Sequence, residues 1–197
     1  PAKTKDFVTA VDEHSIILVK ELKEKETAEE IDRIAKTIEE TLNAETNSHV
    51  YISSGTIVSD LKDVSRSYKE AKMALEVGKI FENEKYIVNY EKLGIGRLIY
   101  QLPLPLCRMF IKEVLHGLTM DDFDDETLAT VNKFFENNLN VSETSRQLYI
   151  HRNTLVYRLD KLQKMTGLDL RNFDDAIIFK ITLMVSKYMM YMDKMAY

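Results

Sequence analysis

The side chains best suited to recognise another molecule lie together in residues 141–167. This stretch has five basic and two acidic residues, a local net charge of +3 in a chain of formal charge -5: Arg146, Arg152, Arg158, Lys161 and Lys164 against Glu143 and Asp160. An Arg guanidinium can donate two hydrogen bonds to guanine, an Asn amide can pair with adenine, and Thr or Tyr hydroxyls can reach phosphates. The acidic total argues against indiscriminate binding to nucleic acid, so the stretch is a local basic patch of the kind that contacts a DNA groove.

Two predicted helices position these side chains. The first has Ser142 as its expected N-cap and runs to about Leu148, and a tight turn follows at residues 149–150. The second runs from about His151 to Met165. Two short helices joined by a tight turn are typical of a helix-turn-helix motif.

The second of these helices has two different faces. At about 100° per residue, Leu155, Leu159 and Leu162 form one buried stripe. Four residues point the opposite way and three lie on the flanks: Asn153, Tyr157, Lys161 and Lys164, then Arg152, Thr154 and Arg158. An ordinary solvated helix has the same pattern, so spacing alone leaves DNA binding and a plain surface helix open as alternatives.

An acidic run precedes the patch: Asp121, Asp122, Asp124, Asp125 and Glu126. We expect its last members to begin a helix through Leu128, Val131 and Phe135, because the helix dipole favours carboxylates at that end. Metal binding and repulsion of DNA phosphate are the alternatives for this run.

The first half of the chain alternates predicted strands and helices. The strands are short apolar runs at residues 15–19, 49–53 and 85–90. The helices begin after Thr27 and at Ser59 or Asp60, and each repeats apolar residues at helical spacing: Ile31, Ile34, Ala35, Ile38 and Leu42, then Val64, Tyr68, Ala71 and Leu75. We therefore predict an α+β protein, with an α/β sandwich, a hinge near Gly94 and Gly96, and an all-α domain after it.

The remaining residues with reactive side chains predict no further site. Cys107 is the single cysteine, which allows no internal disulfide and no zinc site and fits a reducing cytoplasm. The four histidines lack metal-ligand spacing, and residues 94–96 lack the third glycine of a dinucleotide fingerprint. No export signal is visible, and Lys180, Lys187 and Asp193 interrupt the longest apolar stretch. We predict no catalytic, cofactor or metal site, no enzyme activity and no membrane span.

The second half resembles a known domain. Residues 150–155 (Ile-His-Arg-Asn-Thr-Leu), 157–159 (Tyr-Arg-Leu) and 166–170 (Thr-Gly-Leu-Asp-Leu) closely resemble the C-terminal helix-turn-helix domain of the PucR and CdaR transcriptional regulators. The resemblance covers roughly residues 125–188. Ser145 departs from the family, which usually has alanine there, and serine is small enough to pack in its place.

The first half resembles the GGDEF-like domain that often precedes this helix-turn-helix in the CdaR group. The resemblance rests on residues 67–71 (Ser-Tyr-Lys-Glu-Ala) and on residues 86–93. No Gly-Gly-Asp/Glu-Glu-Phe sequence occurs, so cyclase activity is not expected. The first strand and helices of a full GGDEF fold are not found before Ser15, and the chain begins without Met, either because Met was removed or because the chain is the output part of a longer regulator.

The resemblance implies a domain order and a set of partners. The expected parts are a partial GGDEF-like domain at 1–93, a hinge and connecting helix at 94–120, and the helix-turn-helix domain with its C-terminal helix at 121–197. The expected partners are double-stranded DNA, a second copy of the chain, and a small-molecule effector that acts through a missing N-terminal sensor domain. A dimer surface is expected on the methionine-rich last helix: Met184, Met189, Met190, Met192 and Met195.

The resemblance and the helix faces together imply a function and a site. The function is a cytoplasmic, sequence-specific regulator of carbohydrate-diacid or purine-type catabolic genes. The alternative is a metabolite- or nucleotide-sensing α/β module whose helical half serves protein assembly. Eight residues form the predicted DNA-binding site, with Arg146 and Lys161 on phosphate: Arg146, His151, Arg152, Asn153, Thr154, Tyr157, Arg158 and Lys161.

Overall fold

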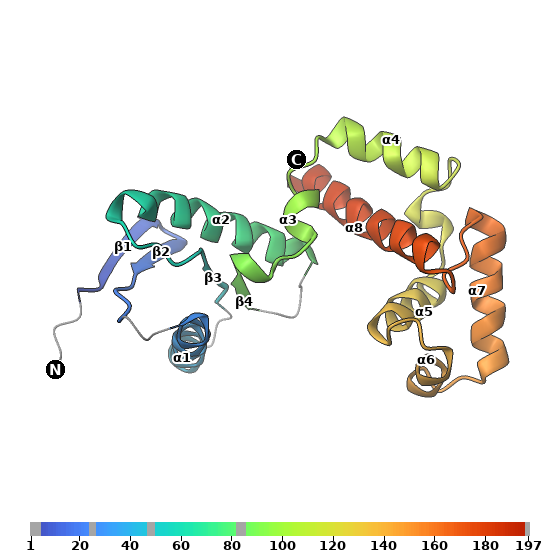
Figure 1. The fold of residues 1–197 in the computed structure, drawn as a ribbon, viewed down its shortest axis with the longest axis horizontal. Coiled ribbons are helices and arrows are strands. Elements are labelled where there is room, and N and C mark those ends of the chain that lie inside the picture. The colour runs from blue at the N-terminus through green and yellow to red at the C-terminus, as the bar shows by residue number, and fades with distance from the viewer. Residues whose placement is uncertain (1–4, 24–26, 47–49, 82–85, 196–197) are drawn as a thin grey trace. The chain divides into compact units, whose positions relative to one another are not determined.

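The computed structural model describes residues 5–23, 27–46, 50–81 and 86–195. The chain divides into two units, and Figure 1 labels the helices and strands of both. The first unit comprises residues 1–75 and 85–90, and the second unit comprises residues 76–84 and 91–197. Among the described residues the first unit mixes short strands with helices and the second is helical. The predicted α+β class is therefore confirmed.

The described strands of the first unit form two separate two-stranded sheets. β1 (Phe7–Asp12) pairs antiparallel with β2 (Ser15–Val19), which has the bounds predicted from its apolar run. β3 (Ile52–Ser54) pairs parallel with β4 (Ile87–Asn89). These two strands are shorter than the predicted 49–53 and 85–90, and His49 and Lys85 lie outside the described residues.

Two helices accompany these strands. α1 (Ala28–Thr46) contacts β3 and β4, and its predicted stripe is turned inward, with Ala35 buried and Ile31, Ile34, Ile38 and Leu42 half-buried. α2 (Val64–Phe81) follows a short 3-10 turn, η1 (Leu61–Asp63), so it begins later than the sequence suggests. Its most buried positions, Ala74 and Val77, lie in its second half.

Polar contacts fix the connection between β3 and α2. A Cβ on Gly55 would lie 2.0 Å from the Ser67 carbonyl oxygen, so only glycine allows this close approach. The Ser67 hydroxyl donates to the Thr56 carbonyl at 2.7 Å, and the Thr56 N–H donates to Glu70 Oε2 at 3.0 Å. The Thr56 hydroxyl donates to the same carboxylate oxygen. The serine and glutamate of the 67–71 motif thus hold the loop that leaves β3.

Among the described residues, the second unit contains the end of α2, six further helices and a short 3-10 turn, η3 (Met120–Asp122). The helices are α3 (Gly96–Ile99), α4 (Leu104–Val114), α5 (Asp125–Glu136), α6 (Val141–Gln147), α7 (Arg152–Thr166) and α8 (Phe173–Met195). A second 3-10 turn, η2 (Tyr90–Lys92), begins at the end of the first unit. Pro103 is the N-cap of α4, and Pro105 lies in its first turn, where proline is tolerated because its missing N–H would have no partner within the helix.

Two apolar clusters stabilise the second unit, and α8 contributes to both. The first cluster contains the buried leucines of α7 together with Phe134 and Phe179, and the Phe179 ring meets Phe123 edge-on with centroids 6.0 Å apart. The second contains Cys107, Val185 and Tyr188. Burial raises the pKa of the Cys107 thiol, as expected for a core cysteine rather than a reactive one.

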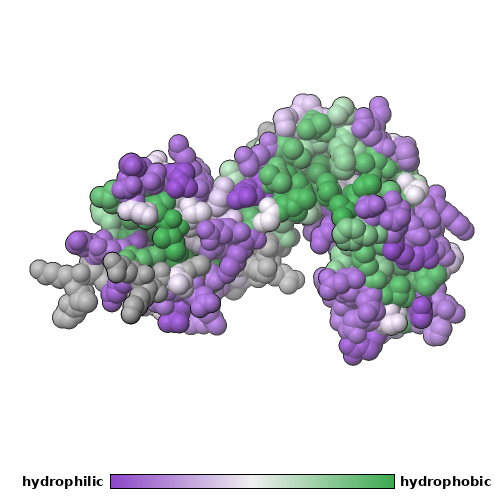
Figure 2. Space-filling model, in the orientation of Figure 1, coloured by the Kyte–Doolittle hydropathy of each residue, from purple (hydrophilic) through white to green (hydrophobic). Residues whose placement is uncertain are grey.

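The surface of the second unit is uneven in polarity. Figure 2 shows hydrophobic residues where α4 and α8 pack together and hydrophilic residues over the outer side of α7. Large apolar side chains stay exposed on both α4 and α8: Leu106, Met109, Met190 and Met195. Within the described ranges, none of the helices combines the length and the apolar character that a membrane crossing needs.

Candidate nucleic-acid interface

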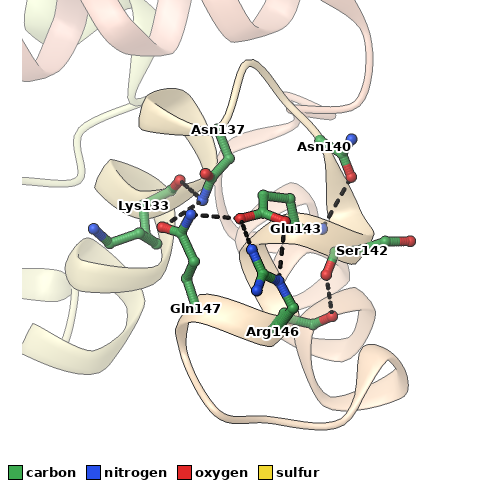
Figure 3. Close-up of polar contacts among 8 residues, drawn as sticks. Lys133, Asn137, Asn140, Ser142, Glu143, Arg146 and Gln147 are labelled. Carbon is green, nitrogen blue, oxygen red and sulfur yellow. Dashed lines mark hydrogen bonds and ion pairs between the residues drawn. The ribbon is translucent and has the colours of Figure 1, made fainter.

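The start of α6 differs from the prediction. Asn140 is its N-cap, and its Oδ1 accepts a hydrogen bond from the Glu143 N–H at 3.0 Å (Figure 3). The expectation that Ser142 caps the helix is wrong, because Ser142 lies inside the first turn. Asn138 and Leu139 adopt positive φ angles of 50° and 63°, which end α5 and let the next helix begin at once.

A polar network ties α6 to the end of α5. Arg146 donates to Glu143 twice, from Nε at 3.1 Å and from Nη2 at 2.6 Å. Gln147 donates to the same carboxylate at 2.6 Å and accepts from Asn137 Nδ2 at 3.3 Å (Figure 3). Hydrogen bonds from Arg146 and Gln147 hold the pKa of Glu143 below its usual value. Arg146 is therefore exposed but already paired.

The turn between α6 and α7 is centred on Tyr149. Its φ is +55°, its N–H donates to the Arg146 carbonyl at 3.2 Å, and the Ile150 N–H donates to the Ser145 carbonyl at 3.0 Å. Tyr149 is 96% exposed. The turn was predicted at this place, but Tyr149 was not among the predicted site residues. An aromatic residue that belongs to no apolar stripe is the signal that could have found it.

The first turn of α7 presents the predicted recognition residues to solvent. His151 is the N-cap, and its Nδ1 accepts from the Asn153 N–H at 3.2 Å. His151, Arg152, Asn153 and Thr154 are all exposed. In the part of the chain that the structure describes, no carboxylate pairs with the Arg152 guanidinium. These four side chains are available to a partner.

The two faces of α7 are as predicted. Leu155, Leu159 and Leu162 are buried in the first apolar cluster. The opposite face is exposed at all four predicted positions: Asn153, Tyr157, Lys161 and Lys164. The buried leucines therefore fix which side of the helix can meet another molecule.

Arg158 faces α5 rather than solvent. Its side chain is only 17% exposed. Nη1 donates to Thr130 Oγ1 at 3.0 Å, and Nη2 pairs with the Glu126 carboxylate. Arg158 thus joins α7 to α5.

Lys161 also contacts α5, at its N-terminus. Its Nζ lies 2.9 Å from Asp124 Oδ2, while Asp124 Oδ1 accepts from the Thr127 N–H at 2.7 Å and caps the helix. Hydrogen bonds to Thr127 and Lys161 hold the pKa of Asp124 well below its usual range. The acidic run begins the helix as expected, and over the described residues no three metal-ligating side chains lie together.

Only some of the predicted site residues share one exposed surface. His151, Arg152, Asn153, Thr154 and Tyr157 form one exposed surface on the first half of α7, whereas Arg146, Arg158 and Lys161 are held in ion pairs. Two helices joined by a tight turn, with the start of the second helix exposed, form the arrangement that inserts into a DNA major groove.

Comparison with known families identifies both halves. Residues 127–185 match the family described as PucR C-terminal helix-turn-helix domain, and residues 2–77 match the GGDEF-like domain. The chain thus carries a helix-turn-helix domain of the class found in transcriptional regulators, together with a GGDEF-like domain. These two matches confirm the resemblance to the PucR and CdaR regulators seen in its motifs.

Individual relatives agree with this class. The chain is similar to the purine catabolism regulatory protein of Bacillus subtilis (strain 168), with 28% identity over 66% of this chain and 25% of that protein. It is 32% identical to the carbohydrate diacid regulator of Escherichia coli (strain K12), over 69% of this chain and 35% of that protein. The DNA-binding transcriptional activator AdeR of Bacillus subtilis is 28% identical over 95% of this chain and 44% of that protein. The chain therefore spans less than half the length of these relatives.

Proposed function

We propose that this chain is the DNA-binding output part of a cytoplasmic regulator of carbohydrate-diacid or purine-type catabolic genes. The observation that carries the proposal is the exposed first half of α7, held in place by its buried leucines. The names of the purine and carbohydrate-diacid relatives support the choice of genes. The chain acts by binding rather than catalysis, and the buried thiol of its single cysteine suits a reducing compartment.

In this proposal the eight predicted residues have three different roles. His151, Arg152, Asn153, Thr154 and Tyr157 meet the DNA, with Arg152 and Asn153 reading base edges in the major groove. Arg146 and Lys161 hold phosphates by exchanging their solvent-accessible carboxylate partners, a small cost because ion pairs open to solvent contribute about 0–1 kcal/mol. Arg158 contributes mainly by holding α7 against α5.

The proposal assigns a role to each part of the chain. Residues 121–197 bind DNA, residues 94–120 connect, and residues 1–93 form the GGDEF-like part. Two copies associate, so that two α7 helices enter successive major grooves about 34 Å apart. The exposed methionines of α8 supply apolar surface for that association. An effector acts through a sensor domain that precedes this chain in the whole regulator.

Selection of binding sites from a random duplex library tests the proposal. The winning duplex is then titrated by fluorescence anisotropy at two salt concentrations. A motif with two half-sites and an affinity that falls with salt is expected, because phosphate contacts release counterions. Failure to enrich any sequence, together with no salt-dependent binding, would contradict it.

The Arg152→Ala variant makes the test specific to α7. The affinity for the selected duplex should weaken by roughly 1–3 kcal/mol, with the melting temperature unchanged, because Arg152 is exposed and has no described ion-pair partner. Arg108→Ala is the matched control, since Arg108 is an exposed arginine on α4 outside the helix-turn-helix. Equal affinities for both variants would remove Arg152 from the interface.

A further inference from the structure

We infer that Tyr149 contacts the sugar-phosphate backbone of DNA next to the groove that α7 enters. This inference rests on the proposed function and adds a residue to its interface. Tyr149 lies in the turn between Arg146, the last basic residue of α6, and His151, the N-cap of α7.

The local backbone disfavours a tyrosine at this position. A φ of +55° is in the left-handed region, where a side chain with a Cβ is strained and glycine is not. The turn itself is closed by backbone hydrogen bonds from residues 149 and 150, which any residue could donate except proline. The backbone conformation of the turn therefore favours glycine over tyrosine at position 149.

The packing of the fold also gives no reason for the tyrosine. Leu139 has a similar φ of 63°, but it packs against the first apolar cluster, so burial offsets its strain. Tyr149 is 96% exposed and belongs to neither cluster. Among the described residues it has no side-chain hydrogen bond and no ring contact. Its aromatic ring and hydroxyl are thus left for a partner.

The position in the motif points to phosphate rather than a base. The first residues of the second helix meet base edges in a helix-turn-helix, whereas tyrosine hydroxyls elsewhere in the interface commonly donate to phosphate oxygens. Tyr149 precedes α7 and lies between two residues of the basic patch, Arg146 and Arg152. A phosphate contact is independent of sequence, so it should strengthen binding to any duplex.

Two variants and one control test the inference. Tyr149→Gly removes the ring and relieves the backbone, and Tyr149→Phe removes only the hydroxyl. His116→Gly is the matched control, because His116 is another exposed residue with positive φ, 52°, and lies outside the helix-turn-helix. Each protein is titrated with the selected duplex and with an unrelated duplex, and its thermal unfolding is recorded.

The expected result is a separation of stability from affinity. Tyr149→Gly should keep or raise the melting temperature while its Kd rises about tenfold on both duplexes, the size of one lost hydrogen bond to a charged group. Tyr149→Phe should lose affinity on both duplexes as well, and His116→Gly should bind as the wild type does.

Three outcomes would overturn the inference. An unchanged Kd for Tyr149→Gly would show that the residue makes no contact. A loss confined to the selected duplex would show that it reads a base, and a lower melting temperature would show that the ring stabilises the fold. If the wild type bound neither duplex, the proposed function itself would fail, which is a different result from wild-type binding that the variants leave unchanged.

Discussion

The two units differ in what holds them together. Among the described residues, every large side chain that is fully buried lies in the second unit, including Phe134, Leu155 and Phe179. The buried apolar residues of the first unit are smaller: Ala35, Ala74 and Val88. In the first unit, the close contact of Gly55 with Ser67 and the hydrogen bonds to Glu70 define the path of the chain.

This difference shows which unit holds its surface side chains in a fixed orientation. Interiors are packed densely, so a helix with a fully buried stripe is fixed in rotation, and α7 presents its polar face in one way only. The β1–β2 hairpin of the first unit exposes Phe7, Val8 and Ile16 instead. The unit that contains α7 is therefore expected to be the more sensitive of the two to loss of apolar volume.

One leucine in each unit gives the largest expected contrast. Leu155→Ala should cost about 3 kcal/mol in the second unit, because Leu155 is fully buried and the deletion leaves a cavity. Leu75→Ala should cost only about 1–1.5 kcal/mol, because the half-buried Leu75 loses less apolar contact. Hydrogen exchange of the α7 and α2 amides measures both. Equal costs would show that the first unit is packed as tightly as the second.

Arg158 offers the next contrast, within the second unit. Arg158→Ala should lower the free energy of unfolding by about 1–3 kcal/mol, because a poorly exposed guanidinium that bridges Thr130 and Glu126 is lost. Arg158→Lys should recover little of this, since an ammonium lacks the planar fork that reaches two acceptors. Urea denaturation measures the loss. If Arg158 acted on phosphate alone, both variants would unfold like the wild type.

The sequence predicted the second unit more fully than the first. The leucine stripe predicted the buried face of α7, the ends of the two helices predicted the turn at residues 149–150, and the helix dipole predicted the place of the acidic run. Periodicity and local interactions determine these features. The separation of the first unit into two short sheets was not predictable. Strand length there depends on pairing between residues far apart in the chain, such as Ile52 with Ile87.

The geometry of the candidate site was predictable only in part, for the same physical reason. The exposed residues at the start of α7 follow from helix geometry. The pairing of Arg158 with Glu126, 32 positions earlier in the chain, does not, because it depends on how α5 packs on α7. Ser142 was chosen as N-cap on residue type, but the positive φ angles of the two residues before Asn140 decided where α6 begins.

Glu70 gives the smallest expected effect and tests whether polar contacts hold the first unit. Burial disfavours its charge, but hydrogen bonds from Thr56 and the nearby Arg66 outweigh burial and keep its pKa below the usual 4.5. A lowered pKa in the folded state adds stability above pH 4.5, and this stability is lost as the pH falls through the folded pKa. Glu70→Gln should thus cost about 1 kcal/mol at neutral pH, and its unfolding curve should converge on that of the wild type in acid.

Denaturant unfolding at a series of pH values between 7 and 3 measures this convergence. Glu40→Gln is the control, because Glu40 is an exposed glutamate of the same unit and its replacement should stay within about 0.5 kcal/mol at every pH. A gap between wild type and Glu70→Gln that stays constant into acid would show that the side chain acts through its shape rather than its charge. The loop after β3 would then depend on the close Gly55–Ser67 contact alone, and the contrast between a polar first unit and an apolar second unit would be weaker.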